Sequence, residues 1–479
     1  MIRAALSLYS VRYPSTIVYM LQSCEYRPGP FLAWYWRTQD FSSVAHRRDL
    51  ERTKRARLLL TVLRAGMFAQ IVAGILLIAL WHFNGLSGGW QFGFALILSY
   101  PIVWAHLITI PLYLGKWFVV APQERRLISQ SKHIFSSHRA ICIAVAGSYG
   151  KTSMKEILLT VLSEGKKVAA TPANKNVSVS HAKFARNLSG DEEVIIVEFG
   201  EGKPGDVKRF ANYTQPTHAV ITGLAPAHLD RYKTLQNAGK DIFSLAEFLD
   251  HRNVYVNGES PDAVDFIAKG DDVYTAEGAL GWNISNINLA ITGTSFVMTK
   301  GKHKMKLASS LLGRHNVGPL ALAAALAYEI GLSEKQIISG VAKVLPYEHR
   351  MQPYSLGGAW VVDDTYNGNI EGVRAGTELL KALPAKRKIY VTPGLVDQGK
   401  KSKEIHETMG ELIAKAKPDQ VVLMHNSAAP HIKAGLDKAK YKGEITIEKD
   451  PLLFYTNLDQ FVAVGDIVLM QNDWTDNYA

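Results

Sequence analysis

Residues 143–155 combine the residue types that bind a polyphosphate. They read Ile-Ala-Val-Ala-Gly-Ser-Tyr-Gly-Lys-Thr-Ser-Met-Lys, an apolar strand that runs into a glycine-rich turn and then a helix. Gly147 and Gly150 allow backbone N–H groups to close on phosphate oxygens. Lys151 can reach the terminal phosphates, and the Thr152 hydroxyl can join the shell of a Mg²⁺ ion. The residues predicted to bind a nucleotide here are Gly147, Ser148, Gly150, Lys151, Thr152 and Ser153.

The turn departs from the usual phosphate loop in one respect. That loop has a further glycine at the position where this chain has Val145. A short Gly-x-x-Gly-Lys-Thr sequence can also be a turn that caps a helix, which is the alternative interpretation. The strand–turn–helix context favours the nucleotide site.

Four polar residues follow at spacings that suit a magnesium–nucleotide site. Glu198 ends the apolar run 194–197, and the carboxyl ends of strands are where open α/β sheets bind ligands. His228 follows another strand-like run, and Lys240 and Asn316 come later in the chain. Each also has a structural interpretation: a buried carboxylate, a solvent-facing histidine, a surface lysine and a helix cap.

In this order, the motifs resemble those of the Mur ligases of peptidoglycan synthesis, and most of all the branch that adds D-Ala-D-Ala. The resemblance covers about residues 141–470. It is carried by Gly147-Ser-Tyr-Gly-Lys-Thr-Ser153, Asn174-Lys-Asn176, Val197-Glu-Phe-Gly200, Ala227-His-Leu229, Gly313-Arg-His-Asn316, Asp363-Asp-Thr-Tyr-Asn-Gly-Asn369, and Gly394-Leu-Val-Asp-Gln-Gly399 with His406.

The resemblance implies an ATP-dependent amide ligase that works through an acyl phosphate. It implies an α/β fold with a P-loop-type central ATPase domain and a C-terminal Rossmann-like domain. It also implies ATP, two Mg²⁺ ions and a carbamylated lysine, here Lys240, as cofactors. Asn316 would hold the adenine. The implied metal ligands are Thr152, Glu198, His228 and Lys240, and the implied catalytic residues are Lys151, Lys240, His228, Arg350 and Asp364, with Arg350 also at the nucleotide.

The basic charge of the chain lies in its N-terminal part. The net charge is +11, and residues 1–140 hold 16 Lys and Arg against 5 Asp and Glu, whereas the remainder holds 38 of each. We therefore expect no nucleic-acid partner for the later domains. The two cysteines, Cys24 and Cys142, have no spacing typical of a disulfide framework or zinc site, and Cys142 reads as a small core residue.

Two apolar stretches, residues 58–83 and 90–114, predict a transmembrane helical hairpin. Each exceeds the roughly 20 residues that cross a bilayer core as a helix. Pro101 and Pro111 should kink the second span. The alternative is a buried helical hairpin of a soluble domain. The basic flanks favour the membrane, and they place both ends of the hairpin and the catalytic domains on the cytoplasmic side of a bacterial cytoplasmic membrane.

The whole chain is expected to hold five parts. Residues 1–57 form a juxtamembrane segment whose aromatic stretch 31–37 is either an interfacial anchor or a helix packed on the catalytic domain. The remaining parts are the hairpin (58–115), a basic linker (116–139), a central ATP-binding domain (140–346) and a C-terminal domain (347–479).

Short apolar runs that alternate with helical periodicity predict two α/β patterns. The expected strands are 141–146, 168–171, 194–199, 219–222, 254–257, 360–362, 388–391, 420–423 and 467–469. The expected helices are 153–163, 205–211, 238–249, 317–329, 373–383 and 402–415. Residues 283–306 predict an antiparallel section.

Three departures from the family concern the substrates. Residues 1–140 hold the hairpin where the family has a UDP-binding domain, so the expected acceptor is a small-molecule or lipid-linked carboxylate. Ile370 stands where the family has proline, and Gln471-Asn-Asp-Trp474 replaces Lys-Gly-Ser-Arg. Both changes touch the domain that selects the amine, so the amine is expected to be an amino acid or dipeptide of open identity.

Two other functions compete with the ligase. One is a catalytically inactive nucleotide-binding scaffold that regulates wall synthesis at the membrane, and the metal-ligand residues argue against it. The other is an ATP-driven transporter, which would need more than two spans and a signalling motif that we do not find in the sequence.

Overall fold

The computed structural model describes residues 6–24, 26–42, 44, 50–85, 88–173, 175–226, 229–366, 368–396, 398 and 401–472. The chain divides into two compact units, Met1–Arg126 and Leu127–Ala479. Each unit is described by itself.

The first unit is built on two antiparallel helices, α4 (Lys54–Asn84) and α5 (Gly89–Leu107). A Cβ added to Gly74 would lie 2.7 Å from the Gly93 carbonyl oxygen, and one added to Gly93 would lie 2.6 Å from that of Gly74. The two backbones therefore approach closely at small residues, as helices in membranes commonly do. Both predicted spans are helical.

The helices of this hairpin are long and apolar enough to cross a membrane. The two candidate helical stretches are Lys54–Asn84 and Gly89–Ser137, and only 22% and 28% of their most apolar windows are buried. The second stretch joins α5 to α6 (Thr109–Gly115), the π-helix η1 (Lys116–Val120) and α7 (Ala121–Ser137). Both stretches have this property by their length and composition, which the core helix of a soluble protein can share.

The two prolines of the second span behave differently. α5 ends at Leu107 and α6 begins at Thr109, so the helix is interrupted where Pro111 has no N–H for the Leu107 carbonyl. Pro101 lies inside α5, which continues through it. The interruption near Pro111 agrees with the predicted kink, whereas Pro101 does not end its helix.

Two short helices, α2 (Tyr13–Ser23) and α3 (Pro28–Arg37), pack on the hairpin. The Tyr13 hydroxyl lies 3.1 Å from the Tyr35 hydroxyl and donates to the Pro101 carbonyl at 3.1 Å. Phe31 is buried in the same cluster, whereas Trp36 is 70% exposed. Within the first unit, the aromatic stretch thus packs mainly inward against the hairpin.

The central part of the second unit is a parallel sheet in the order β2-β3-β1-β4-β5-β6. Its strands are β1 (Ile141–Ala146), β2 (Val168–Ala170), β3 (Val194–Glu198), β4 (His218–Ile221), β5 (Val254–Asn257) and β6 (Asp272–Tyr274). The first five confirm the predicted strands. β6 is too short to show a period in the sequence.

Helices cover both faces of this sheet because alternate residues of its buried strands point to opposite sides. Ile143 and Val145 pack with α8 (Lys151–Leu162) and α14 (Val317–Glu329), whereas Cys142 and Ala144 pack with helices of the other face. The helices of the other face include α10 (Asp206–Thr214) and α12 (Leu235–Phe248). The burial of Cys142 confirms it as a core residue, and burial raises the pKa of its thiol to about 12.

The remaining elements of the central domain are shorter. An antiparallel sheet in the order β10-β9-β8-β7 confirms the section predicted over 283–306. Its strands are β7 (Gly278–Ala279), β8 (Trp282–Ala290), β9 (Gly293–Lys300) and β10 (His303–Ser309), and the other helices are α9 (Ser178–Arg186), α11 (Leu229–Tyr232), α13 (Pro261–Val264), η2 (Arg314–Asn316) and α15 (Glu334–Ala342).

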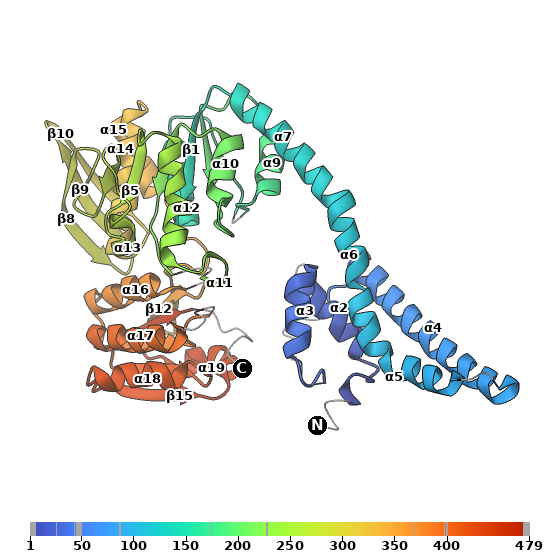
Figure 1. The fold of residues 1–479 in the computed structure, drawn as a ribbon. Helices are drawn as coiled ribbons and strands as arrows, with labels where there is room; N and C mark the ends of the chain where they lie inside the picture. The colour runs from blue at the N-terminus through green and yellow to red at the C-terminus, as the bar shows by residue number, and fades with distance from the viewer. Residues whose placement is uncertain are drawn as a thin grey trace. The chain divides into compact units, whose positions relative to one another are not determined.

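The C-terminal domain has a six-stranded sheet of its own in the order β11-β12-β16-β13-β14-β15, in which only β11 runs antiparallel to its neighbour. Its strands are β11 (Gln352–Leu356), β12 (Ala359–Asp364), β13 (Arg387–Thr392), β14 (Gln420–Met424), β15 (Glu444–Glu448) and β16 (Asp466–Gln471), and its helices are α16 (Ile370–Ala382), α17 (Ser402–Ala416), α18 (Ala429–Lys438), α19 (Pro451–Thr456) and α20 (Leu458–Phe461). Helices α16, α17 and α18 lie side by side (Figure 1). Every strand and helix predicted for this domain is present.

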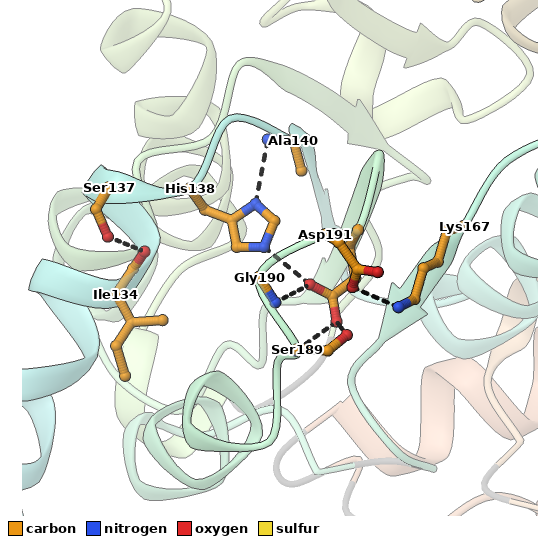
Figure 2. A network of polar contacts seen from close by, with 9 residues as sticks. Ile134, Ser137, His138, Ala140, Lys167, Ser189, Gly190 and Asp191 are labelled. Carbon is orange, nitrogen blue, oxygen red and sulfur yellow. Dashed lines mark hydrogen bonds and ion pairs between the residues drawn. The ribbon is translucent and has the colours of Figure 1, made fainter.

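A buried polar network joins the end of α7 to the central sheet (Figure 2). The Ala140 N–H donates to His138 Nδ1 at 3.2 Å, so Nε2 carries the proton and donates to Glu192 Oε2 at 2.8 Å. Glu192 Oε1 accepts from the N–H and hydroxyl of Ser189, each at 2.7 Å. Burial alone raises the pKa of the Glu192 carboxyl, but the hydrogen bonds from Ser189 and His138 outweigh it and hold that pKa well below its usual range.

We expect Glu192→Gln to destabilise the second unit by about 1–3 kcal/mol at neutral pH, because a buried carboxylate with several donors is replaced by an amide. The folded-state pKa is depressed, so this stability is present above the unfolded carboxyl pKa of about 4.3 and is lost as pH falls through the folded value. Thermal unfolding of the full chain at several pH values measures the effect. The exposed neighbour Glu193, changed to Gln, is the control, and a wild-type advantage that grows in acid would contradict the assignment.

Candidate nucleotide and metal site

The turn between β1 and α8 has a backbone that requires glycine. Gly147 has φ +141° and Gly150 has φ +73°, both in the region that other residues rarely adopt. A Cβ on Gly147 would lie 2.3 Å from the Thr222 hydroxyl oxygen. The Ser148 N–H donates to the Gly223 carbonyl at 2.9 Å, which ties the turn to the end of the neighbouring strand β4. The turn is therefore held open at the amino end of α8, where an anion is favoured.

Lys151 is paired with a carboxylate that the sequence reasoning missed. Its Nζ donates to the Gly147 carbonyl at 2.5 Å and to Glu201 Oε2 at 2.6 Å. The two side chains of this ion pair are only 12% and 5% exposed. The positive charge predicted for terminal phosphates is thus neutralised inside the protein. Its position in the sequence could have indicated it, because Glu201 lies in the loop directly after Glu198, at the ligand edge of the sheet.

Glu198 lies beside the turn because β3 pairs with β1. The register sets Val145 opposite Glu198, so the carboxylate reaches the level at which the turn begins. Glu198 Oε1 accepts from the Thr152 hydroxyl at 3.2 Å and from Asn176 Nδ2 at 3.1 Å. Its Oε2 is buried without a hydrogen-bond partner. The structure therefore brings together Lys151, Thr152 and Glu198, which the sequence singled out from separate segments.

Two buried residues behind Glu198 were also missed. His181 Nε2 bonds the Glu198 carbonyl oxygen at 2.8 Å, and its Nδ1 lies 2.7 Å from the Tyr213 hydroxyl. Burial lowers the pKa of His181 to about 4, so the ring is neutral and Nε2–H is the donor to the carbonyl. Lys155, one turn along α8 from Lys151, lies 3.7 Å from Glu198 Oε2. Neither residue stands out in the sequence, because a helix-borne histidine or lysine usually faces solvent.

The donor set around Glu198 fits Mg²⁺. Mg²⁺ prefers hard oxygen ligands and is usually held by one or two carboxylates together with phosphates and waters. The Thr152 hydroxyl and the partnerless Glu198 oxygen supply that chemistry at the mouth of the phosphate turn. Among the residues that the structure describes, no group of three or more His, Cys, Asp or Glu side chains could hold a metal by itself.

Two of the other predicted metal and nucleotide residues lie apart from this cluster, and a third is not described. His228 lies outside the described residues, as does Asn174 of the motif that carries the resemblance. Lys240 is exposed on α12, and its side chain makes no ion pair or hydrogen bond with the residues that the structure describes. Asn316 occupies the N-cap position of α14 without a capping hydrogen bond, and its amide donates to the Leu312 carbonyl at 2.7 Å. Asn316 thus lies at the predicted cap position but its side chain does not cap the helix, and the roles given to these residues stay predictions.

In the C-terminal domain, Asp364 sits in a buried network at the carboxyl ends of β12 and β16. Gln471 Nε2 donates to Asp364 Oδ2 at 2.6 Å, and the Met351 N–H donates to Oδ1 at 3.2 Å. The Tyr390 hydroxyl donates to Gln471 Oε1 at 2.7 Å. Burial raises the pKa of Asp364 to about 7, against the hydrogen bonds from Gln471 and Met351. Gln471, the first residue of the segment that lacks the expected Lys-Gly-Ser-Arg, is thus a direct partner of the predicted catalytic carboxylate.

Arg350 and His406 differ in whether their side-chain nitrogens all have hydrogen-bond partners. The Arg350 guanidinium lies 4.7 Å from the centroid of the Tyr366 ring, and its Nε is buried without a hydrogen-bond partner. His406 Nε2 accepts from the Leu395 N–H at 2.9 Å, and Nδ1 bonds the Ser402 carbonyl at 2.7 Å. Both ring nitrogens of His406 are therefore used to hold the loop after β13, whereas Arg350 keeps an unpaired donor.

Comparison with known families identifies both domains. Residues 145–327 match the model of the Mur ligase middle domain, and residues 349–471 match that of the Mur ligase glutamate ligase domain. The chain belongs to the Mur ligase family. The phosphate turn and Glu198 lie in the first match, and Arg350 and Asp364 lie in the second.

Relatives of this Mur ligase carry the name UDP-N-acetylmuramoyl-tripeptide–D-alanyl-D-alanine ligase. The Escherichia coli protein is 25% identical over 287 residues, which cover 58% of this chain and 63% of the relative. The Treponema pallidum protein is 28% identical over 270 residues, which cover 56% and 57%. The chain therefore spans about three fifths of the length of the curated relatives that it matches.

Solved structures of the family share the fold. MurF from Acinetobacter baumannii has a TM-score of 0.64 at 20% identity and covers 73% of this chain and 77% of its own. The MurF ligase from Thermotoga maritima, solved in complex with ADP, has a TM-score of 0.63 at 22% identity and covers 73% and 80%. At these identities the likeness establishes the mixed α/β fold.

We expect Glu201→Gln to tighten the binding of ADP or ATP by about tenfold, equal to about 1.4 kcal/mol. The amide keeps the shape of the side chain but no longer neutralises Lys151 or repels a phosphate. Isothermal titration with nucleotide measures the change. Glu164→Gln, at the far end of α8, is the control and should leave the affinity unaltered. Weaker nucleotide binding by Glu201→Gln would assign that carboxylate a supporting role instead.

Proposed function

We propose that this chain is an ATP-dependent ligase that forms an amide bond through an acyl phosphate. The observation that carries the proposal is the meeting of Lys151, Thr152 and Glu198 at the phosphate turn. In the reaction, an acceptor carboxylate oxygen attacks the terminal phosphorus of ATP, and the bond to ADP breaks. An amine nitrogen then attacks the acyl carbon, inorganic phosphate leaves, and the amine gives up one proton.

The residues of the turn suit the first step. Backbone N–H groups at the start of α8 and the ammonium of Lys151 would bind phosphate oxygens, where preorganised positive charge stabilises the transferring group. Thr152 and Glu198 would hold Mg²⁺, which when bound neutralises charge on the phosphoryl group. By family resemblance, His228 and a carbamylated Lys240 would hold a second Mg²⁺.

The residues of the C-terminal domain suit the second step. Arg350 has an unpaired donor for a phosphate or carboxylate, and Asp364 is buried at the end of β12, where the charge of Arg350 acts on it. A carboxyl group whose pKa lies at about 7 can accept a proton from an attacking amine at neutral pH. Asn316 would contact the adenine. Closure of the two domains over the substrates would bring these groups to the turn.

The first unit supports a location at the cytoplasmic membrane of a bacterium, with the catalytic domains in the cytoplasm. Its hairpin is long and apolar, and the basic flanks of the sequence favour that orientation. A membrane location suits a lipid-linked carboxylate as acceptor, with a small-molecule acceptor as the alternative. The incoming amine is an amino acid or a dipeptide, and the overall role is in cell-wall peptide synthesis.

The ligase is tested by phosphate release from ATP. The full chain in detergent should release phosphate only when a muropeptide-type acceptor and an amine are both supplied. Lys151→Ala should abolish release, because the terminal phosphate loses its cation, whereas Lys302→Ala at an exposed position should not. Hydrolysis without substrates would count against the ligase, and no hydrolysis with any acceptor tried would favour the inactive scaffold.

The membrane assignment is tested by sedimentation. The full chain should sediment with membranes and resist an alkaline wash, because a spanning hairpin is not released by changes of charge. A variant that lacks residues 1–126 retains the second compact unit and should remain in the supernatant. Sedimentation of that variant, or release of the full chain by the alkaline wash, would refute the hairpin as the anchor.

A further inference from the structure

Lys155 is a fully buried lysine that the proposed chemistry does not use. It lies on α8 one turn after Lys151, and its side chain has no exposed area. Burial of an ammonium costs several kcal/mol unless it is paired and hydrogen-bonded. A buried charge next to a proposed metal site therefore calls for a physical explanation.

The donors of Lys155 are fixed by the loop that follows β2. Its Nζ donates to the Thr171 carbonyl at 2.8 Å and to the Ala173 carbonyl at 2.5 Å. It also pairs with Glu156 at 3.0 Å. Because backbone carbonyls cannot rotate away as side chains do, the ammonium has a defined place between α8 and this loop.

The same loop holds Glu198. The Thr171 hydroxyl accepts from the Glu198 N–H at 3.0 Å, and the Asn176 amide donates to Glu198 Oε1 at 3.1 Å. Glu198 Oε2 faces Lys155 Nζ at 3.7 Å, which is an ion pair without a hydrogen bond. One oxygen of the carboxylate is thus held by hydrogen bonds and the other by a fixed cation that leaves its lone pairs free.

We propose that Lys155 is a positioning residue that orients the Glu198 carboxylate, through the ion pair and through its hydrogen bond to the Thr171 carbonyl, so that Oε2 is free to bind Mg²⁺. This inference rests on the proposed function, since it takes Glu198 as a metal ligand. It adds a residue that acts on the metal only through another side chain.

The sign of the change in metal affinity distinguishes a positioning role of Lys155 from a purely electrostatic one. Loss of a cation 3.7 Å from the ligand oxygen would by itself favour Mg²⁺, because positive charge that repels the metal is removed. Loss of orientation has the opposite sign, since the carboxylate and Asn176 no longer share one arrangement. Removal of an outer-shell partner typically weakens metal binding by about 10–100-fold. We expect this weakening to prevail.

The test is the binding of Mn²⁺, as a probe for Mg²⁺, to the full chain with ADP, followed by electron paramagnetic resonance. Lys155→Met should weaken the metal by about tenfold or more, while ADP affinity without metal and the thermal midpoint show whether the nucleotide turn and the fold survive. Lys155→Gln keeps a donor for the carbonyls and serves where the Met variant fails to fold. Lys300→Met removes a lysine that donates to the Leu280 carbonyl at 2.9 Å elsewhere in the domain, and it should leave the metal unaffected.

A double-mutant cycle with Glu198→Gln identifies the route of the effect. If Lys155 acts through Glu198, its replacement should change metal binding much less in the Glu198→Gln background. Unchanged or tighter metal binding in both Lys155 variants, or full additivity in the cycle, would overturn the proposal while leaving the ligase intact. A wild-type chain that binds neither ADP nor metal would overturn the proposed function as well.

Discussion

The parallel pairing of β1 with β3 on one side and β4 on the other is the constraint on which the candidate site depends. It sets Val145 opposite Glu198 and Ala146 opposite Ile221, so the phosphate turn, the carboxylate and the loop after β4 end at one edge. Burial of the apolar side chains of these strands specifies the register, and hydrogen bonds between backbone groups hold it. The polar residues of the site can therefore be few, because the sheet has already aligned the segments that carry them.

The sequence predicted those parts of the fold whose signal is local. Buried strands such as β1 and β3 read as short apolar runs, and α14 reads as a continuous Ala/Leu helix, so their bounds agree with the structure. Residues with a motif, such as Lys151 and Glu198, were found for the same reason. Glu201, Lys155 and His181 were missed because their importance comes from partners far along the chain, and each alone resembles an ordinary helix or loop residue.

In the C-terminal domain, a segment that departs from the family pattern contacts a buried carboxylate. Gln471 begins the segment that lacks the expected Lys-Gly-Ser-Arg, and its amide donates to Asp364 and to the Gly372 carbonyl. Burial raises the pKa of Asp364, and the hydrogen bonds from Gln471 and Met351 and the charge of Arg350 only partly offset it. The segment that departs from the family pattern thus contributes to the electrostatics of the domain proposed to receive the amine.

The ion pair between Lys151 and Glu201 makes nucleotide binding an exchange of one anion for another. The incoming terminal phosphate must displace a carboxylate that is already in place, so part of its interaction energy is spent on that displacement. In the proposed reaction, the carboxylate would be at hand to take the lysine back after phosphoryl transfer. A competitor within the protein would then favour departure of the spent nucleotide, at the expense of tight binding.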